Sequence, residues 1–133
     1  MRQLSVGAAL MFLAVALGAI GAHAFGARLE STGHQDTWQT AVLYHLVHGL
    51  ALVATGIWQA VDRPRANAAW SRAGGWLWAS GILLFSGSLY VWSLGGPKWL
   101  VHVTPLGGLC FLAGWALLAI GLWRRMRAEG ATE

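Results

Sequence analysis

The side chains with the widest chemical capacity stand close together between Tyr44 and His48. Tyr44 and His48 are four positions apart, so they share one face of a helix, with His45 beside them. A histidine can carry a proton near neutral pH, accept a hydrogen bond or bind a metal ion. The neighbouring residues are apolar, and an ionisable side chain within a membrane span is costly enough to suggest a function. This stretch is therefore the first candidate for a binding site or a proton pathway.

A metal or haem centre would be the most specific use of these histidines. Haem ligation by two histidines requires them on facing helices at similar depth, and His48 has no counterpart at its own depth. The pair His45-x-x-His48 also lacks carboxylate or cysteine partners in its stretch. We therefore predict no cofactor and no metal site.

Enzymatic chemistry finds equally little support. Asp36 and Asp62 fall in different connections, so they cannot form a pair of catalytic carboxylates. A serine of the third apolar run with His48 would be a dyad without an acid to orient it. Cys110 stands alone inside an apolar run, which is typical of an inert buried thiol. We predict that the protein is not an enzyme.

The composition indicates what must position these residues. Of the 133 residues, 56% are apolar and 11% are charged, whereas a soluble domain averages about 25% charged residues. The apolar content and the single cysteine exclude a disordered chain and a disulfide scaffold. The nine Lys and Arg residues lie between apolar runs and form no basic groove, so we expect no nucleic-acid partner. The bilayer is the expected partner.

Four uncharged runs are long enough to cross a membrane as helices, which requires about 18 residues or more. We predict an all-α membrane protein with one domain over 1–133 and spans at 4–25, 38–61, 73–94 and 100–123. The first run also imitates a signal peptide that ends at Ala22-His23-Ala24. Its apolar stretch exceeds the usual length of about 7 to 15 residues, so we favour a retained helix.

Orientation follows from the cations, because cytoplasmic connections carry the excess of Lys and Arg. The N-terminus, the second connection and the C-terminus share one side of the membrane, and the first and third connections share the other. The first side holds Arg2, Arg63, Arg65, Arg72, Arg124, Arg125 and Arg127, and the second holds Arg28 and Lys98. Both termini are therefore predicted to be cytoplasmic, with the four spans antiparallel.

Small residues recur every seven positions within the spans, which keeps one seam of a helix facing its neighbour. The seams are Gly7, Ala14 and Gly21; Gly49 and Gly56; Gly74, Gly81, Ser88 and Gly95; and Gly107, Gly114 and Gly121. Close approach at small residues drives helix association in lipid, so we predict a compact four-helix bundle. The same seams could also join copies of the chain or other subunits. Most tryptophans, Trp38 and Trp78 among them, are predicted to anchor the spans at the two interfaces.

Nearly all polar side chains of the spans fall in the outer half of the membrane, as judged from a rise of about 1.5 Å per residue. They predict an outward-facing polar pocket with Tyr44 and His48 as its floor. Its other predicted members are His23, Ser86, Ser88, Tyr90 and Thr104. The alternative is that these groups only bond to one another across helices. Thr104 before Pro105 further predicts that the fourth helix begins near residue 104, with His102 left in the connection.

The chain resembles the family called domain of unknown function 423, whose eukaryotic members are called transmembrane protein 256. Four segments carry the resemblance: VALGAIGAH at 15–23, the 38–52 stretch, LFSGSLY at 84–90 and VTPLGGLCFLAGW at 103–115. The matching positions are His23, Tyr44, His48, Ser86, Ser88, Tyr90, Thr104 and Pro105. His45 departs from the pattern, standing where glutamine is expected, and His102 lies outside it. The resemblance implies a small four-helix protein of the bacterial inner membrane and supplies no biochemical activity.

These observations lead to one functional prediction and two alternatives. We predict a non-enzymatic protein that binds or transports a small or lipid-like molecule through the polar pocket. The first alternative is an accessory subunit or assembly factor of a larger membrane complex that uses a glycine seam as its interface. The second, less favoured alternative is a redox protein that binds a metal or haem.

Overall fold

The computed structural model describes residues 2–61 and 68–131, and the described chain is helical with short connections. The first span is α1, Arg2–His23, and the second is α3, Gln35–Val61. The predicted third span is made of α4 (Ala68–Gly81), the π-helix η1 (Ile82–Ser86) and α5 (Gly87–Ser93), and the last is α6, Leu100–Gly130. Three of these helices, α1, α3 and α6, are each long and apolar enough to cross a membrane. Asp62, Arg63 and Arg65 lie outside the described residues.

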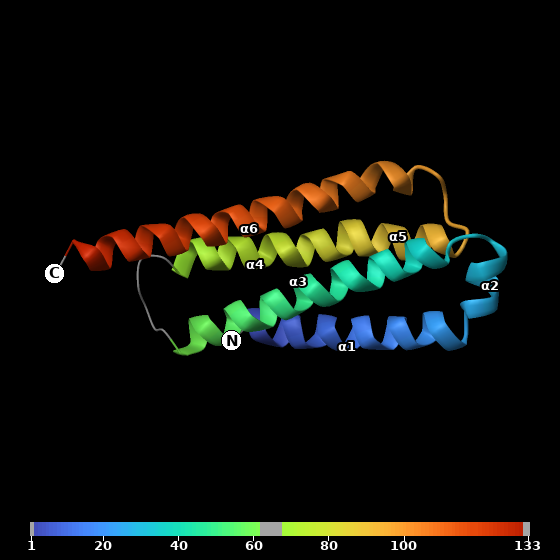
Figure 1. The fold of residues 1–133 in the computed structure, drawn as a ribbon, viewed down its shortest axis with the longest axis horizontal. Coiled ribbons are helices and arrows are strands. Elements are labelled where there is room, and N and C mark those ends of the chain that lie inside the picture. Colours follow the sequence, from blue (N-terminus) through green and yellow to red (C-terminus); the bar gives the residue numbers. More distant parts are fainter. Residues whose placement is uncertain (1, 62–67, 132–133) are drawn as a thin grey trace.

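The four long helical segments, or rods, are α1, α3, the α4–η1–α5 segment and α6. They run antiparallel and form two closely packed hairpins. α1 packs along α3, and α6 packs along α4 and η1. α3 joins the hairpins through its contacts with α4, η1 and α5. Seen down its shortest axis, the molecule has α1 and α6 at opposite edges (Figure 1), so it is more open than the compact bundle that we predicted. The N- and C-terminal ends lie at the same end of the rods.

The seven-residue seams are confirmed as packing surfaces within the chain. A Cβ atom on Gly7 would lie 3.0 Å from the Val53 nitrogen, and one on Gly56 would lie 2.9 Å from the Cα of Leu4. In the other hairpin, a Cβ on Gly74 would lie 2.8 Å from the carbonyl oxygen of Gly114. Because these approaches are too close for any side chain, the glycines bring α1 against α3 and α4 against α6.

One member of the predicted seams is wrong. Gly95 lies after the end of α5, in the tight turn that leads to α6, and its φ of 92° is in the left-handed region that favours glycine. It therefore serves the turn and not a helix seam. Ser88, one heptad earlier, is buried against α6 as predicted.

Two of the tryptophans predicted as interfacial anchors are buried inside the protein. Trp38 is only 3% exposed; its ring covers Gly21 of α1 and its indole N–H donates to the carbonyl oxygen of Leu17 at 3.1 Å. Trp78 is fully buried between α4 and α6 beside Gly114. Each ring occupies the space that a glycine on the neighbouring helix leaves open, a long-range pairing that counting along one span cannot show.

The predicted start of the fourth helix is also wrong. α6 begins at Leu100, so His102 lies in its first turn and Pro105 lies inside the helix. The Thr104 hydroxyl does not cap the helix. It lies 3.3 Å from the carbonyl oxygen of Leu100, one turn back, and 2.8 Å from the Ser88 hydroxyl. The hydroxyl of Thr104 is therefore bonded inside the helix, as is common for threonine, and does not act as an N-cap.

A short helix that the sequence did not predict, α2 (Gly26–Ser31), follows α1. The Arg28 guanidinium donates to the carbonyl oxygen of Leu94 at 2.9 Å, which ties the first connection to the third. Gly33, with φ 71°, reverses the chain into α3. The end of the molecule opposite the termini is thus held together by a contact between two connections.

Candidate functional site

The predicted pocket residues do not meet in one cavity, and the structure distributes them over separate places. His23 is exposed at the end of α1, away from the contacts made by the others. Tyr90 lies between α5 and α3, Ser88 and Thr104 join α5 to α6, and Tyr44 and His48 line a groove between α3 and α6. Each place has its own chemistry.

The contact between Tyr90 and α3 involves His45, which is not among the predicted site residues. The two side chains are buried, with the Tyr90 hydroxyl 3.3 Å from Nδ1 of His45. The ring of Trp38 lies against Tyr90 with centroids 4.8 Å apart. This arrangement has the properties of a packed core with one internal hydrogen bond.

Ser88 and Thr104 form the only predicted cross-helix pair that bonds directly within the described residues. Their hydroxyl oxygens are 2.8 Å apart, and either can donate. Each also lies near a carbonyl oxygen of its own helix, Phe85 at 2.9 Å from Ser88 and Leu100 at 3.3 Å from Thr104. Both hydroxyls are therefore fully used in holding α5 to α6, and neither lines a described cavity.

His48 is the best-defined polar group of the site. Its ring is 4% exposed and stacks on Phe111 with centroids 3.6 Å apart. The indole N–H of Trp115 donates to Nε2 of His48 at 3.2 Å, so Nε2 carries no proton. Nδ1 must then bear the proton and donate to the Tyr44 carbonyl oxygen at 2.8 Å. These two bonds fix a neutral imidazole in a single tautomer.

Rings from three helices surround His48. Tyr44 stacks over it with centroids 5.9 Å apart, as the four-residue spacing predicted, and Tyr44 also lies 4.6 Å from Phe85 of η1. Phe85 and Phe111 are 5.6 Å apart. The result is an aromatic wall with one buried imidazole in it.

This wall lines a groove of about 520 Å³ between α3 and α6. The residues around it are Tyr44, Val47, His48, Phe85, Pro105, Gly108, Leu109, Phe111, Leu112 and Trp115. No carboxylate or lysine is among them. The groove thus contains two of the predicted site residues, but its surface is aromatic and aliphatic, in contrast to the polar pocket that we expected.

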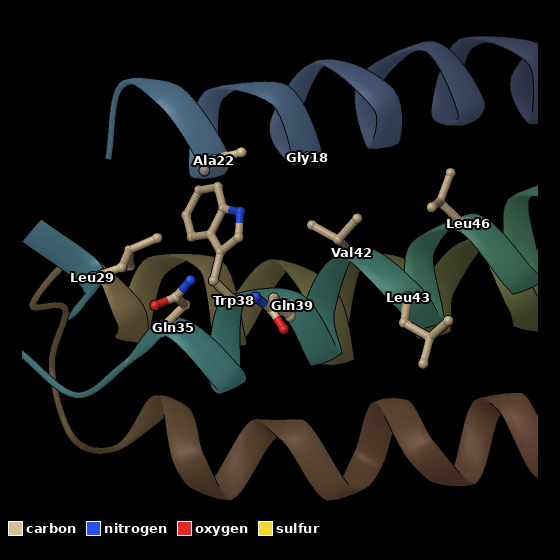
Figure 2. A pocket seen from close by; sticks show the side chains of 10 residues that line it. Gly18, Ala22, Leu29, Gln35, Trp38, Gln39, Val42, Leu43 and Leu46 are labelled. Atoms are coloured by element: carbon tan, nitrogen blue, oxygen red, sulfur yellow. The ribbon is translucent and has the colours of Figure 1, made fainter. Parts of the chain in front are cut away.

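A second cavity, of about 420 Å³, lies between α1, α2 and α3. Figure 2 shows the Trp38 ring between α1 and α3, with Gln35 on one side of it and Gln39, Val42 and Leu46 on the other. None of the predicted site residues lines this cavity. Trp38, which lines it, already donates its indole N–H to the carbonyl oxygen of Leu17.

The comparisons with known proteins decide the family. The family model described as "Protein of unknown function (DUF423)" matches residues 17–108. This chain belongs to that family. The resemblance seen in the sequence is confirmed. The matched region includes Tyr44, His48 and Phe85 and ends before Phe111 and Trp115.

Three relatives show what kind of protein the DUF423 chain is similar to. A UPF0382 membrane protein of Staphylococcus haemolyticus is 37% identical over 90% of this chain and 93% of its own. UPF0382 membrane protein YwdK of Bacillus subtilis is 36% identical over 86% of this chain and 90% of its own. UPF0382 inner membrane protein YgdD of Escherichia coli is 38% identical over 87% of this chain and 85% of its own. No solved structure is significantly similar.

These findings make the DUF423 chain a small helical membrane protein in contact with the lipid bilayer, located in a bacterial inner membrane as predicted. Within the described residues, no group of three or more His, Cys, Asp or Glu side chains is placed to hold a metal ion. His48 has a partner on each ring nitrogen, whereas His45 is bonded through Nδ1 and its buried Nε2 has no hydrogen-bond partner among the residues that the structure describes.

Sequence reasoning missed Trp115 and Phe111 as members of the site. Trp115 lies well inside its apolar run, whereas most tryptophans lie near the ends of theirs, and that unusual depth was the available signal. Phe111 lies one turn before it on the same face of α6. Two aromatic residues at this spacing on a span, facing a histidine on another span, indicate a ring cluster only when the pairing of the helices is known.

Proposed function

We propose that this protein is a non-enzymatic binding protein for a small, lipid-like molecule that carries a ring, held in the groove between α3 and α6. The observation that carries the proposal is the aromatic wall of Tyr44, Phe85, Phe111 and Trp115 around the buried His48 imidazole. The ring surfaces that line the groove suit a flat apolar group, because offset and edge contacts between aromatic rings are each worth about 0.5–1.5 kcal/mol beyond burial.

The surroundings of the groove favour entry from the membrane. The side chains at its mouth include Val47, Leu109 and Leu112, which are 46%, 61% and 68% exposed. All three are apolar, so this side of the molecule suits hydrocarbon and not water. A ligand that dissolves in the bilayer would reach the aromatic wall without crossing a polar surface.

The polar part of the ligand is expected to be small. Both nitrogens of His48 are engaged, whereas the Tyr44 hydroxyl makes no hydrogen bond to any residue that the structure describes. One hydroxyl or carbonyl group on the ligand could bond there. With no carboxylate on the walls and His48 fixed in one tautomer, we assign the groove to binding or transport and not to a reaction.

A filling substitution tests the proposal with a close control. A Cβ added at Gly108 would lie 3.9 Å from Phe85 and no closer to any other neighbour, so Gly108→Leu projects into the groove without disturbing the packing. Ala113→Leu adds bulk to an exposed position of the same helix that does not line the groove. Dodecylphenol, which has a ring, one hydroxyl and a hydrocarbon tail, is a suitable probe for native mass spectrometry of the purified protein.

We expect Gly108→Leu to weaken dodecylphenol binding at least tenfold and Ala113→Leu to leave it unchanged. Equal binding by the two variants would refute the groove as the site. The alternative function, a subunit of a larger membrane complex, would be favoured if mild detergent extraction always yields the protein with the same partner in fixed ratio. The glycine seams offer little support for that alternative, because they are occupied by contacts within the chain.

We further propose four membrane spans with both termini in the cytoplasm. The helical backbone continues from α4 through η1 to α5, since Gly81, Ser86 and Gly87 all have helical φ and ψ. Its 26 residues correspond to about 39 Å of helix, enough to cross a bilayer. Most described arginines lie at the end that holds the termini, as the positive-inside rule requires of a cytoplasmic face.

Cysteine labelling tests this orientation. In a Cys110→Ala background, Lys98→Cys in the third connection is expected to react with a membrane-impermeant maleimide added to intact cells. Ala128→Cys near the end of α6 is expected to react only after the cells are opened. The reverse pattern would invert the proposed topology.

A further inference from the structure

The arginines at the end of α6 are held against tryptophan rings from three helices. The Arg124 guanidinium lies over Trp70 of α4, 4.8 Å from the ring centroid, and Arg127 lies over Trp123 at 4.0 Å. Arg125 lies 5.8 Å from the ring centroid of Trp58 on α3. We call these three arginines and three tryptophans the arginine patch. It gathers the ends of α3, α4 and α6 at one place.

The carboxylates that the structure describes balance little of this charge. Among the acidic residues that the structure describes, Glu129 pairs with Arg125 at 3.0 Å. Glu30 and Asp36 lie in α2 and at the start of α3, at the other end of the rods. Arg124 and Arg127 are exposed, and each guanidinium contacts a tryptophan ring instead of a described carboxylate. The patch therefore has a net positive charge that faces the surroundings.

The ring contacts also affect how the charge is presented. A guanidinium carries its N–H donors as a planar fork, and those that do not point at the ring remain free to bond to another group. That fork matches the oxygens of a phosphate, to which arginine can donate two parallel hydrogen bonds. The ring fixes the guanidinium in advance, which lowers the entropy lost on binding.

We propose that the arginine patch binds the phosphate of an anionic phospholipid, with Arg124 and Arg127 as the main donors. A lipid is the favoured source of the phosphate because the patch stands at the ends of membrane-length helices, where tryptophan rings sit at headgroup level. Basic residues at the cytoplasmic ends of spans bind anionic headgroups by the same attraction. This site is separate from the groove between α3 and α6, so either proposal can fail without the other.

Native mass spectrometry of the full chain in detergent, titrated with dioleoylphosphatidylglycerol or dioleoylphosphatidylcholine, measures the site directly. We expect the unmodified protein to bind phosphatidylglycerol more tightly than phosphatidylcholine. An arginine near a membrane surface contributes about 1 kcal/mol, so Arg124→Gln is expected to weaken binding of phosphatidylglycerol about fivefold. Lys98→Gln removes one exposed positive charge at the other end and should leave this binding unchanged.

Two further variants distinguish a defined binding site from non-specific electrostatic attraction between the protein and anionic lipid. Trp70→Leu keeps the charge of Arg124 but removes its ring, and we expect a loss of affinity similar to that of Arg124→Gln. Arg127→Gln should act in the same direction, and thermal unfolding in detergent shows whether each variant remains folded. If Trp70→Leu binds as the unmodified protein does, or if Lys98→Gln weakens binding equally, the patch is not a site.

Inorganic phosphate distinguishes the two sources of the ligand group. Millimolar phosphate should not displace phosphatidylglycerol, because the free ion lacks the acyl chains that hold a lipid beside the rings. Displacement at that concentration would overturn the assignment to a lipid. Equal binding of the two phospholipids would overturn the role of the charge.

Discussion

Exchanging glycine for alanine at two adjacent positions of α6 measures how closely this helix packs on η1. A Cβ at Gly107 would lie 2.7 Å from the Cβ of Phe85 and 2.8 Å from its Cα, whereas one at Gly108 would lie 3.9 Å from the Phe85 ring. Ordinary contacts of a Cβ begin at 3.4 Å. The backbone nitrogen of Phe85 would lie closer still, so in Gly107→Ala α6 and η1 must separate by more than 0.7 Å, the difference between 3.4 and 2.7 Å.

The expected cost follows from this displacement. Forcing an extra methyl group into a packed interface costs about 1–3 kcal/mol. Both substitutions gain about 1 kcal/mol of helix propensity relative to glycine, and this gain cancels when the two variants are compared. We therefore expect Gly107→Ala to be less stable than Gly108→Ala by about 1–3 kcal/mol, or roughly 5- to 150-fold in the unfolding equilibrium.

Unfolding in mixed micelles of dodecyl maltoside and sodium dodecyl sulfate, followed by circular dichroism, gives the two free energies of unfolding. The two variants share helix and neighbourhood and differ by one position, so the comparison needs no correction for the detergent. If Gly107→Ala were as stable as Gly108→Ala, or more stable, α6 could not lie against η1 as described. The aromatic wall, which depends on the same contact, would then be wrong as well.

Two other outcomes follow from the segment between α4 and α6. A double-mutant cycle of Ser88→Ala and Thr104→Val, with unfolding as the readout, should give a coupling energy of about 0.6 kcal/mol, the average for such pairs in membranes; a coupling of zero would mean that the pair does not form. A π turn holds one residue more than an α turn, so deletion of the exposed Leu83 from η1 should convert it to an α-helix and preserve the fold. Deletion of the exposed Ala113 from α6 should rotate the following residues by about 100° and abolish folding; thermal unfolding that ranks the deletions in the opposite order would contradict this account of η1.

The outline of the fold could be read from the sequence because it depends on local properties. Uninterrupted apolar runs marked the helical rods, and the seven-residue spacing of Gly7, Ala14 and Gly21 marked the face that α1 turns to α3. A seam shows that a helix packs closely but does not show against which neighbour. The pairing of α1 with α3 and of α4 with α6, and the open arrangement that results, required the three-dimensional structure.

The polar residues were harder to place because depth in the membrane does not fix direction around a helix. Ser88 and Thr104 were predicted at neighbouring depths and do bond to each other. His23 was predicted at a depth suited to the pocket, yet it lies exposed at the end of α1. The insertion of one residue at η1 also shifts the faces of α5 relative to α4, which a constant helical period cannot anticipate.

His45 and His48 show why residue type alone gave an incomplete account of the site. His48 was predicted to form the floor of a polar pocket and His45 was not assigned to it, but both bond to residues inside the protein: Tyr90 for His45, and Tyr44 and Trp115 for His48. An imidazole without such partners would be costly to bury in lipid, so the partners explain how a histidine can stand near the middle of a span. Because both nitrogens of His48 are already bonded, a ligand can contact only the edge of its neutral ring within the aromatic wall. This favours a molecule chosen by shape and apolar surface, and it makes the bilayer the natural source of that molecule.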